Sequence, residues 1–492
     1  MTTVTAAATP PVPGAGRSRR RRTSRAHGDE AAPRSGTSPP VDSPAAVDDD
    51  LPLLDPERDL LGMPGAPEHP PAGVERVRRA HQEVRARIRA DRLMDAGAPP
   101  DGTGGELFRA MPGVAMVHPP AEPELRRRVT NAVRCLERLV QRFPYDAELQ
   151  DFLDVPQEFR RWILREPEPE RLRVDFCRLD LLGGTLGTVR VLEFNASSPG
   201  GMISVGTVNR YWRQSSLGGL LTEWGVPDAP FERPEWFADW LIGYGRDHGV
   251  AEEDRRSVGL FHHRSTSGYE MGQVSEQLRR RGCTPVGLEP ADLGSDSALR
   301  LGYLKYFPLN VRKVESWETF CARLTKKRLL VPNALAERWV AENKLCLAAL
   351  SDPRFRRLFT PRQLAALDAF VPFSRKLGDG VSTAEAVAER ARFVLKAPYG
   401  CRGESVTVGA ETPPEAWQQL VGSADRRGWL VQERIGTPVV EVTGGRYFRD
   451  LVVPVLDGRI IGYGSRMSQG HLLNVARGGG SATVFAPPGA DG

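Results

Sequence analysis

The clearest structural pattern in this sequence lies in residues Val174–Gly201, VDFCRLDLLGGTLGTVRVLEFNASSPGG. Apolar and polar residues alternate over Val174–Leu182 and again over Val189–Asn195. The residues between these two stretches include three glycines, Gly183, Gly184 and Gly187. A period of two on both sides of a glycine-rich turn predicts a β-hairpin.

One face of this hairpin is expected to be polar. Successive side chains of a strand point to opposite faces, so Arg178 and Asp180 share a face, as do Glu193 and Asn195. A turn centred near Thr185–Leu186 would place Arg178 opposite Glu193, whereas a shift of one residue would separate the polar set. Carboxylate and amide oxygens on one rigid surface suit Mg²⁺ that also holds phosphate oxygens. An ordinary hairpin with its polar face in water remains the alternative.

A second candidate site is a glycine-containing loop. An apolar strand ends at Lys396, and a loop with Gly400 and Gly403 leads into a second alternating stretch, Ser405–Val408. The glycines let the backbone approach phosphate closely, Lys396 can reach phosphate oxygens, and Arg402 can stabilise the terminal phosphate. The spacing differs from that of a P-loop, which disfavours a P-loop NTPase. A tight turn without a ligand is the commoner explanation of such a loop taken alone.

Two further positions are nucleotide-binding candidates. Trp429–Glu433 is a predicted strand that ends in Gln432-Glu433, whose backbone groups could meet the edge of an adenine. A buried edge strand explains the same pattern equally well. Lys344 begins an apolar helical pattern and is either a phosphate contact or a surface lysine.

Strand and helix patterns continue around these motifs. A strand at Ser257–His262, a helix near Glu270–Arg280 and a strand near Thr284–Leu288 predict a small parallel βαβ unit. Helices are expected at Val74–Met94, Glu124–Phe143, Ala334–Leu350 and Pro361–Ala369. Five stretches are expected to be strands of a second sheet: Phe393–Lys396, Ser405–Val408, Trp429–Glu433, Leu451–Val455 and Arg459–Gly462.

Composition narrows the class of protein. The formal charge of +5 is small for 492 residues, and the strong basic run Arg17–Arg22 is not continued as a broad basic face, so we expect no nucleic-acid partner. Six cysteines show no pair at metal-ligand spacing, which indicates free thiols in a reducing compartment. No apolar run suits secretion or a membrane span, so we expect a cytoplasmic protein with no membrane partner.

Taken together and in this order, the motifs resemble the ATP-grasp superfamily, in particular the circularly permuted branch that contains glutathionylspermidine synthase. In ordinary ATP-grasp enzymes a Glu-x-Asn metal motif follows the lysines and the adenine hinge. Here Glu193-Phe-Asn195 precedes Lys344, Lys396 and Gln432-Glu433, which is the order expected after permutation. The resemblance covers residues 120 to 480, and it departs from the family where Lys396-Ala-Pro398 replaces the usual Lys-Pro.

The resemblance implies a circularly permuted ATP-grasp core. Together with the patterns above, we expect an α/β (α+β) fold with a helical N-terminal part, a small βαβ subdomain and a disordered N-terminal tail. Residues 1–72 lack aromatic side chains and are rich in Pro, Ala, Ser and Arg, as a disordered tail would be. The other expected parts are a helical region with the Mg-binding hairpin of the core (73–250), a βαβ substrate-side subdomain (251–333), an ATP-binding lid (334–440) and the C-terminal part of the core (441–492).

The resemblance also implies roles for individual residues. The Mg²⁺ ligands would be Asp180, Glu193 and Asn195. The residues around ATP would be Lys344, Lys396, Gly400, Gly403, Gln432 and Glu433.

The catalytic residues implied by the resemblance surround the transferred phosphoryl group and the substrate carboxylate. They are Arg178, Arg402 and Arg466, together with Ser198, which matches a serine beside the activated carboxyl. Asn474 and Arg477 are similar to a tail motif of related permuted proteins.

The implied function is an ATP- and Mg²⁺-dependent carboxylate–amine ligase, which forms a peptide or amide bond through an acyl phosphate and releases ADP and phosphate. Its partners would be small-molecule carboxylate and amine substrates, amino acids or peptides, and the expected setting is specialised metabolite biosynthesis. Two alternatives stay open: an ATP-grasp kinase that forms a stable phosphorylated product, and a non-catalytic nucleotide-binding partner. The pattern predicts neither the acid, nor the amine, nor the oligomeric state.

Overall fold

The computed structural model describes residues 60–62, 71–95, 106–263, 268–306, 317–400, 405–442, 445–470, 473 and 479–488. These residues belong to one compact unit, Leu54–Gly492. The predicted tail, residues 1–72, falls outside the described residues except for 60–62 and the start of the first helix. The predicted divisions at residues 250, 333 and 440 remain predictions.

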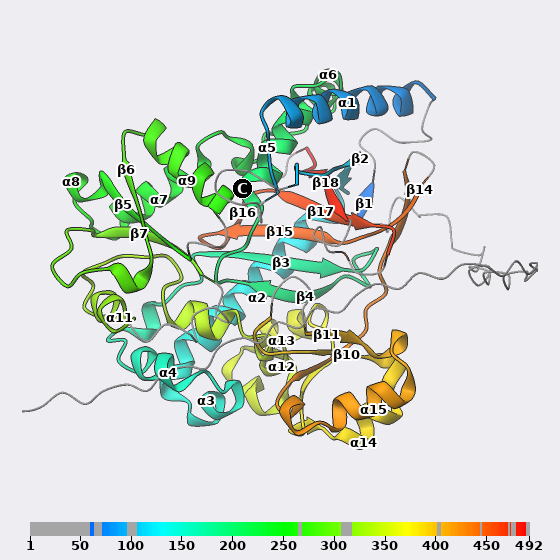
Figure 1. Ribbon diagram of the computed structural model, residues 1–492. Helices are drawn as coiled ribbons and strands as arrows, with labels where there is room; N and C mark the ends of the chain where they lie inside the picture. The colour runs from blue at the N-terminus through cyan, green and yellow to red at the C-terminus, as the bar shows by residue number, and fades with distance from the viewer. Residues whose placement is uncertain are drawn as a thin grey trace, which may run out of the picture. The chain divides into compact units, whose positions relative to one another are not determined.

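The acidic hairpin forms one end of a ten-stranded sheet in a mixed α/β fold (Figure 1). Strand β3 (Phe176–Leu182) pairs antiparallel with β4 (Arg190–Asn195), which confirms the predicted hairpin. The strand order is β1-β2-β18-β17-β15-β3-β4, and β13, β14 and β16 attach beside this path. The other strands are β1 (Leu61–Gly62), β2 (Ala110–Val117), β13 (Val439–Val442), β14 (Gly445–Arg449), β15 (Leu451–Leu456), β16 (Arg459–Ile460), β17 (Tyr463–Ser468) and β18 (Gly480–Phe485).

The register of the hairpin differs from the prediction by two residues. Arg178 lies opposite Asn195 and Asp180 opposite Glu193, so the expected pairing of Arg178 with Glu193 was wrong. The turn is longer by one residue than assumed, and a bulge beyond Asp180 leaves Leu192 without a partner across the ladder. Because the two shifts add up to an even number, the four polar residues stay on one face.

The predicted second sheet was also partly wrong, because its strands divide between two sheets. A five-stranded sheet has the order β11-β10-β12-β8-β9. Its members are β8 (Ser374–Leu377), β9 (Gly380–Val381), β10 (Phe393–Lys396), β11 (Val406–Val408) and β12 (Leu430–Glu433). In contrast, β15 pairs with β3 from Leu451 opposite Leu181 to Leu456 opposite Phe176. Local alternation identifies a strand but carries no information about its distant partner.

The predicted parallel unit is confirmed. β5 (Ser257–His262) lies between β6 (Thr284–Leu288) and β7 (Leu301–Lys305), and both pairings are parallel. Helix α9 (Gly268–Arg280) connects β5 to β6. The strand β7 was not foreseen in the sequence.

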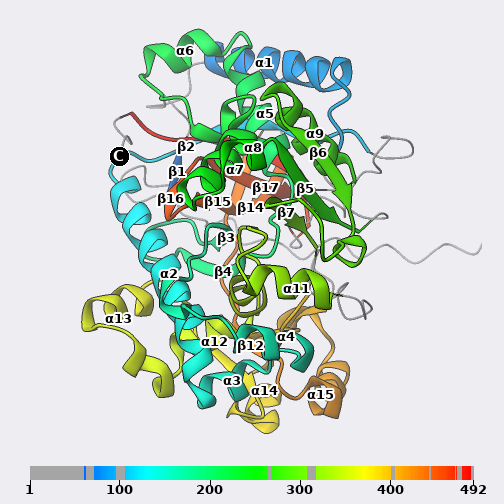
Figure 2. The ribbon, with the colours of Figure 1, turned by 90° about the vertical axis from the view of Figure 1, so that its left-hand side faces the viewer.

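The helices surround these sheets (Figure 2). In both views α1 lies beside α5 and α6, on the side of the large sheet away from the five-stranded sheet (Figures 1 and 2). The helices are α1 (Pro71–Ala90), α2 (Glu122–Arg142), α3 (Ala147–Leu153), α4 (Gln157–Ile163), α5 (Met202–Arg213), α6 (Gly218–Glu223), α7 (Trp236–Asp247), α8 (Glu252–Arg255), α11 (Glu318–Thr325), α12 (Leu345–Ser351), α13 (Pro361–Asp368), α14 (Thr383–Ala388) and α15 (Pro414–Gly422). None of these described helices combines the length and apolar character that crossing a membrane requires.

The continuous helix expected over Ala334–Leu350 is broken in the structure. A π-helical turn, Glu337–Ala341, precedes a separate helix α12 that begins at Leu345. The widened turn buries a run of polar side chains, which a regular amphipathic helix would expose on one face. Lys344 lies at the junction and is 6% exposed, so the surface-lysine alternative is wrong.

The apolar face of the hairpin forms part of the main core. Cys177, Leu179 and Phe194 are buried beneath it, as the alternation predicted, whereas the bulged Leu192 is only half-buried. Five described cysteines are free thiols, as expected.

A buried asparagine, Asn333, connects the start of β3 to the end of β4 through hydrogen bonds. Its Nδ2 donates to the carbonyls of Phe176, at 2.5 Å, and Ala196, at 2.7 Å. Its Oδ1 accepts the N–H of Asp175 at 2.9 Å. Asn333 has a φ of 48°, a left-handed conformation that asparagine tolerates better than most residues. This single side chain therefore holds both strands at the point where the polar site begins.

We expect Asn333→Ala to lower the free energy of unfolding by about 3 kcal/mol or more. The variant leaves two buried carbonyls and one buried N–H without their hydrogen-bond partner, and each such group costs about 1–3 kcal/mol. Urea unfolding of the variant and of wild type measures the difference. The exposed Lys326→Ala is the control and should change stability by less than about 0.5 kcal/mol. A loss no larger than that of the control would contradict the role of Asn333.

Candidate functional site

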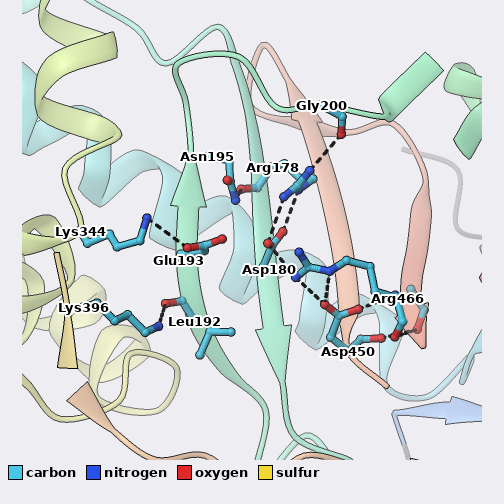
Figure 3. A network of polar contacts seen from close by, with 11 residues as sticks. Arg178, Asp180, Leu192, Glu193, Asn195, Gly200, Lys344, Lys396, Asp450 and Arg466 are labelled. Atoms are coloured by element: carbon cyan, nitrogen blue, oxygen red, sulfur yellow. Dashed lines mark hydrogen bonds and ion pairs between the residues drawn. The ribbon is translucent and has the colours of Figure 1, made fainter. Parts of the chain in front are cut away.

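The polar face of the hairpin carries a buried carboxylate between two guanidinium groups (Figure 3). Asp180 is 0% exposed and accepts from Arg178 through Nε at 2.8 Å and Nη2 at 3.1 Å. Arg466 of β17 donates its Nη2 to the same carboxylate at 2.8 Å. Burial by itself would raise the pKa of Asp180, but the charges of the two arginines outweigh it and hold the pKa well below its usual range. Asp180 is therefore ionised at all ordinary pH values.

A second buried carboxylate, Asp450, fixes the orientation of Arg466. It accepts Arg466 Nε at 2.7 Å and the Arg466 backbone N–H at 2.5 Å. Although burial disfavours a charged guanidinium, the carboxylates of Asp180 and Asp450 raise the pKa of Arg466. Sequence reasoning missed Asp450, because the approach of its segment to β17 depends on the sheet order.

Two lysines reach the opposite strand of the hairpin from distant parts of the chain. Lys344 Nζ lies 3.2 Å from Glu193 Oε2 and donates to the carbonyl of Gly400 at 2.9 Å. Lys396 Nζ donates at 3.0 Å to the carbonyl of Leu192, the bulge residue that has no partner across the ladder. Both lysines are buried, and Figure 3 shows them approaching β4 side by side. The structure thus brings together two of the predicted ATP contacts and the acidic hairpin.

The two ammonium groups differ in their electrostatic surroundings. Burial lowers the pKa of Lys396 to about 8, and the carboxylate of Glu193 offsets this only in part. The pKa of Lys344 is raised, because Glu193 and Glu342 together outweigh the effect of burial. Of the two lysines, Lys396 is therefore the one whose charge is more sensitive to mildly alkaline pH.

The predicted adenine hinge lies in the five-stranded sheet. Gln432 is 0% exposed, and its Oε1 accepts from Lys396 Nζ at 2.6 Å. Its strand β12 lies between β10 and β8, so the alternative of a buried edge strand was wrong. The N–H of Glu433 already donates to the carbonyl of Phe373 at 2.8 Å. A hinge at this position must therefore use other backbone groups, and the role remains a prediction.

The loop after the hairpin carries Ser198 and contacts Arg178 through Gly200. Ser198 is buried, and its Oγ donates to the carbonyl of Tyr306 at 3.4 Å. Two residues further on, the carbonyl of Gly200 accepts Arg178 Nη1 at 3.0 Å. The predicted residues Arg402 and Gly403, and the tail residues Asn474 and Arg477, lie outside the described residues.

A third buried carboxylate, Glu342, supports the turn between β4 and this loop. Its Oε2 accepts the N–H groups of Ala196 at 2.6 Å and of Ser197 at 2.7 Å. Burial raises the pKa of Glu342, and the charge of Lys344 and the two N–H donors oppose the rise. Its place two residues before Lys344 was the only sequence signal that could have suggested it.

The oxygen atoms on this face fit a hard cation such as Mg²⁺ in part. Asp180 uses three of about four lone-pair positions for its arginines. Glu193 pairs with Lys344 and also interacts with the neighbouring carboxyl of Asp180. Asn195 donates through Nδ2 to the carbonyl of Arg178, and its Oδ1 makes none of the hydrogen bonds found among the described residues. The described residues include no group of three or more His, Cys, Asp or Glu side chains suited to a metal. An ion would therefore need Asn195 beside Glu193, with Asp180 contributing its remaining lone pair.

Comparisons of this chain with known proteins do not identify its family. No family model matches the sequence, and no curated protein matches it. Among solved structures, the crystal structure of a "Putative gamma-glutamylcysteine synthetase" from Methylobacillus flagellatus KT matches 70% of this chain and 84% of its own chain. The two sequences are 13% identical over the match, and the TM-score is 0.34. A likeness at that level carries no argument about activity.

We expect Glu342→Ala to lower the free energy of unfolding by roughly 2–5 kcal/mol, because two buried N–H groups lose their acceptor. Glu342→Gln is the matched variant: its amide oxygen can accept the same two hydrogen bonds, and the loss should stay below about 1 kcal/mol. Urea unfolding of both variants provides the comparison. Equal losses would show that the charge, and not the acceptor atom, is what the turn requires.

Proposed function

We propose that this chain is an ATP- and Mg²⁺-dependent carboxylate–amine ligase with a circularly permuted ATP-grasp fold. The observation that carries the proposal is the convergence of Lys344 and Lys396 on the strand of Glu193, beside the two arginines that enclose Asp180. Buried cations next to carboxylate and amide oxygens are what a triphosphate with its divalent ion requires.

The sheet order also supports a permuted chain. Strand β15, from the C-terminal part, pairs with the hairpin strand β3, and β18 pairs in parallel with β2. The two ends of the described chain thus complete one sheet, whereas the lysines lie on segments between them in sequence. In a permuted ATP-grasp protein the metal-binding hairpin is separated in the same way from the nucleotide lid.

In this proposal Lys344 and Lys396 bind the phosphates of ATP. Lys344 would turn from Glu193 Oε2 to a phosphate oxygen. Glu193 Oε2 would then be free to bind the metal ion. Glu193 and Asn195, with the remaining lone pair of Asp180, would hold Mg²⁺. The ion would neutralise negative charge on the β- and γ-phosphates.

In this proposal the arginines Arg178 and Arg466 bind and orient the acid substrate. Arg466 is held by Asp450 and Asp180 through Nε and Nη2, and Nη1 makes none of the hydrogen bonds found among the described residues. A guanidinium fixed in this way presents a pre-oriented N–H edge to a carboxylate or to the equatorial oxygens of a transferring phosphoryl group. Arg178, fixed by Asp180 and Gly200, stands on the other side of the same carboxylate.

The reaction then has two steps. A carboxylate oxygen of the acid attacks the γ-phosphorus, the bond to ADP breaks, and an acyl phosphate forms. The amine attacks the acyl carbon, phosphate leaves with the bonding electron pair, and the amine loses a proton to give the amide. The buried lysines and arginines would keep the acyl phosphate oriented for attack by the amine.

Incubation with ATP, Mg²⁺, hydroxylamine and pooled amino acids or small peptides tests the proposal directly. Hydroxylamine intercepts an acyl phosphate regardless of the natural amine, so acid-dependent ADP with hydroxamate is the expected result. AMP with pyrophosphate would indicate adenylation and would overturn the proposal. ADP together with a stable phosphorylated product and no hydroxamate would identify a kinase instead.

We expect Glu193→Ala to reduce hydroxamate formation by about 10³-fold or more, because it removes a proposed metal ligand and the partner of Lys344. The exposed Glu223→Ala is the matched control and should leave the rate within about two-fold. The rates of ADP and hydroxamate release are measured together. Turnover by Glu193→Ala at the rate of the control would exclude the metal role of this hairpin.

We also expect ATP affinity to fall as the pH rises above about 8, by up to tenfold per pH unit, because free Lys396 then loses its proton. Below that pH the ammonium is already charged, and affinity should be nearly constant. Calorimetric titration across about pH 6.5–9.5 measures the change. Lys396→Met should bind ATP weakly and without this pH step; a step that persists in the variant would have to come from another group.

A further inference from the structure

A buried ion pair outside the proposed ATP and metal contacts joins the parallel sheet to the loop after the hairpin. Lys305 is the last residue of β7, and Glu270 lies in the first turn of α9. Lys305 Nζ and Glu270 Oε2 are 2.9 Å apart, and the two side chains are 2% and 6% exposed. Removing both charges from water is expensive, and apolar residues often stabilise such a position as well or better. The pair therefore calls for a role beyond filling the core.

The pair holds the backbone of the loop Ser198–Gly201. Lys305 Nζ donates to the carbonyls of Ser198, at 3.1 Å, and Pro199, at 3.3 Å. Glu270 Oε1 accepts the N–H of Gly201 at 3.2 Å. The ammonium thus donates to two loop carbonyls, while its charge lies 2.9 Å from Glu270 Oε2. The loop is thus fixed at three backbone groups, those of Ser198, Pro199 and Gly201, by side chains from β7 and α9.

The loop passes this constraint on to the site. The carbonyl of Gly200 accepts Arg178 Nη1, and Arg178 in turn holds Asp180. A Cβ at Gly200 would lie 3.8 Å from Glu270 Oε2 and 3.9 Å from Lys305 Nζ, so the ion pair is packed directly against this glycine. Through the same loop the pair also sets the position of Ser198.

We infer that Lys305 and Glu270 are positioning residues, which hold the Ser198–Gly201 loop so that Arg178 and Ser198 face the acid substrate. The catalytic part of this inference rests on the proposed ligase function, whereas the control of the loop can be measured independently. Lys305 and Glu270 touch neither of the lysines assigned to ATP. Their loss should therefore affect chemistry and not nucleotide binding.

The double variant Lys305→Met/Glu270→Gln separates positioning from stability. It leaves no unpaired buried charge, so its midpoint of thermal unfolding should recover part of the loss seen in Lys305→Met alone. It also removes both hydrogen bonds to the loop carbonyls. If the pair served stability alone, turnover would return together with stability; if it positions the loop, turnover stays low in the folded double variant.

The exposed pair Lys327–Glu166 provides a matched control, because it has the same chemistry and the same 2.9 Å separation. The variant Lys327→Met/Glu166→Gln should leave every measurement within about two-fold of wild type. For Lys305→Met/Glu270→Gln we expect hydroxamate formation to fall roughly 10²-fold, as for a small misplacement of a catalytic group, and the Kd for ATP to change by less than about two-fold.

Hydrogen exchange of the Gly201 amide gives a readout that needs no turnover. We expect this amide to exchange at least about ten-fold faster in the double variant than in wild type or in the control. The amide oxygen of Glu270→Gln can still accept the Gly201 N–H, but without Lys305 nothing holds the carbonyls of Ser198 and Pro199, so the loop opens more often. Unchanged exchange, or turnover within about two-fold of wild type, would overturn the inference. If wild type forms no hydroxamate, the proposed function fails, and the exchange measurement still decides whether the pair controls the loop.

Glu270→Asp is the second variant, in case the double variant does not fold. It keeps the charge but withdraws the carboxylate by one methylene from Gly201 and Lys305. We expect this variant to remain folded, to lose protection at Gly201 and to lose turnover. Wild-type exchange and turnover in Glu270→Asp would overturn the inference in the same way.

Discussion

The enclosure of Asp180 by two arginines is the interaction on which the rest of the site depends. A fully buried carboxylate is tolerated only when its charge and hydrogen-bonding capacity are matched. One partner, Arg178, lies on the same strand, but the other, Arg466, comes from β17, with β15 between β17 and β3. Burial of this one charge therefore requires the order β17-β15-β3-β4, and with it the return of the C-terminal segment to the hairpin.

Charges of opposite sign alternate outward from this centre. Asp450 fixes Arg466, Glu193 meets Lys344, and Glu342 holds the turn beyond β4. Each of these charged groups is thus satisfied by another part of the protein, which favours a single ordered arrangement of the site. A bound triphosphate would exchange partners within an ordered set of cations, and little reorganisation would be needed. That is the arrangement expected of a site that acts by electrostatic stabilisation.

The differences between expectation and structure have specific physical origins. The register of the hairpin depends on a longer turn and on a bulge at Leu192, and neither is encoded in simple alternation. The bulge matters for the site, because the carbonyl of Leu192 accepts a hydrogen bond from Lys396 Nζ. The expected long helix at residue 334 gives way to a π-helical turn, which delivers Glu342 and Lys344 to the hairpin as buried groups. Local pattern alone would have left both of them on a helix surface.

The sequence by itself determined the elements whose pattern is local. The hairpin, its polar and apolar faces, the parallel βαβ unit and the strand ending at Lys396 all follow from the spacing of side chains along the chain. Only the tertiary structure decided which distant segments meet: β15 with β3, Asp450 with Arg466, and Lys305 and Glu270 with the Ser198 loop. The reason is that periodicity is a property of neighbouring residues, whereas these contacts are selected by the joint burial of charge and apolar surface across the whole domain.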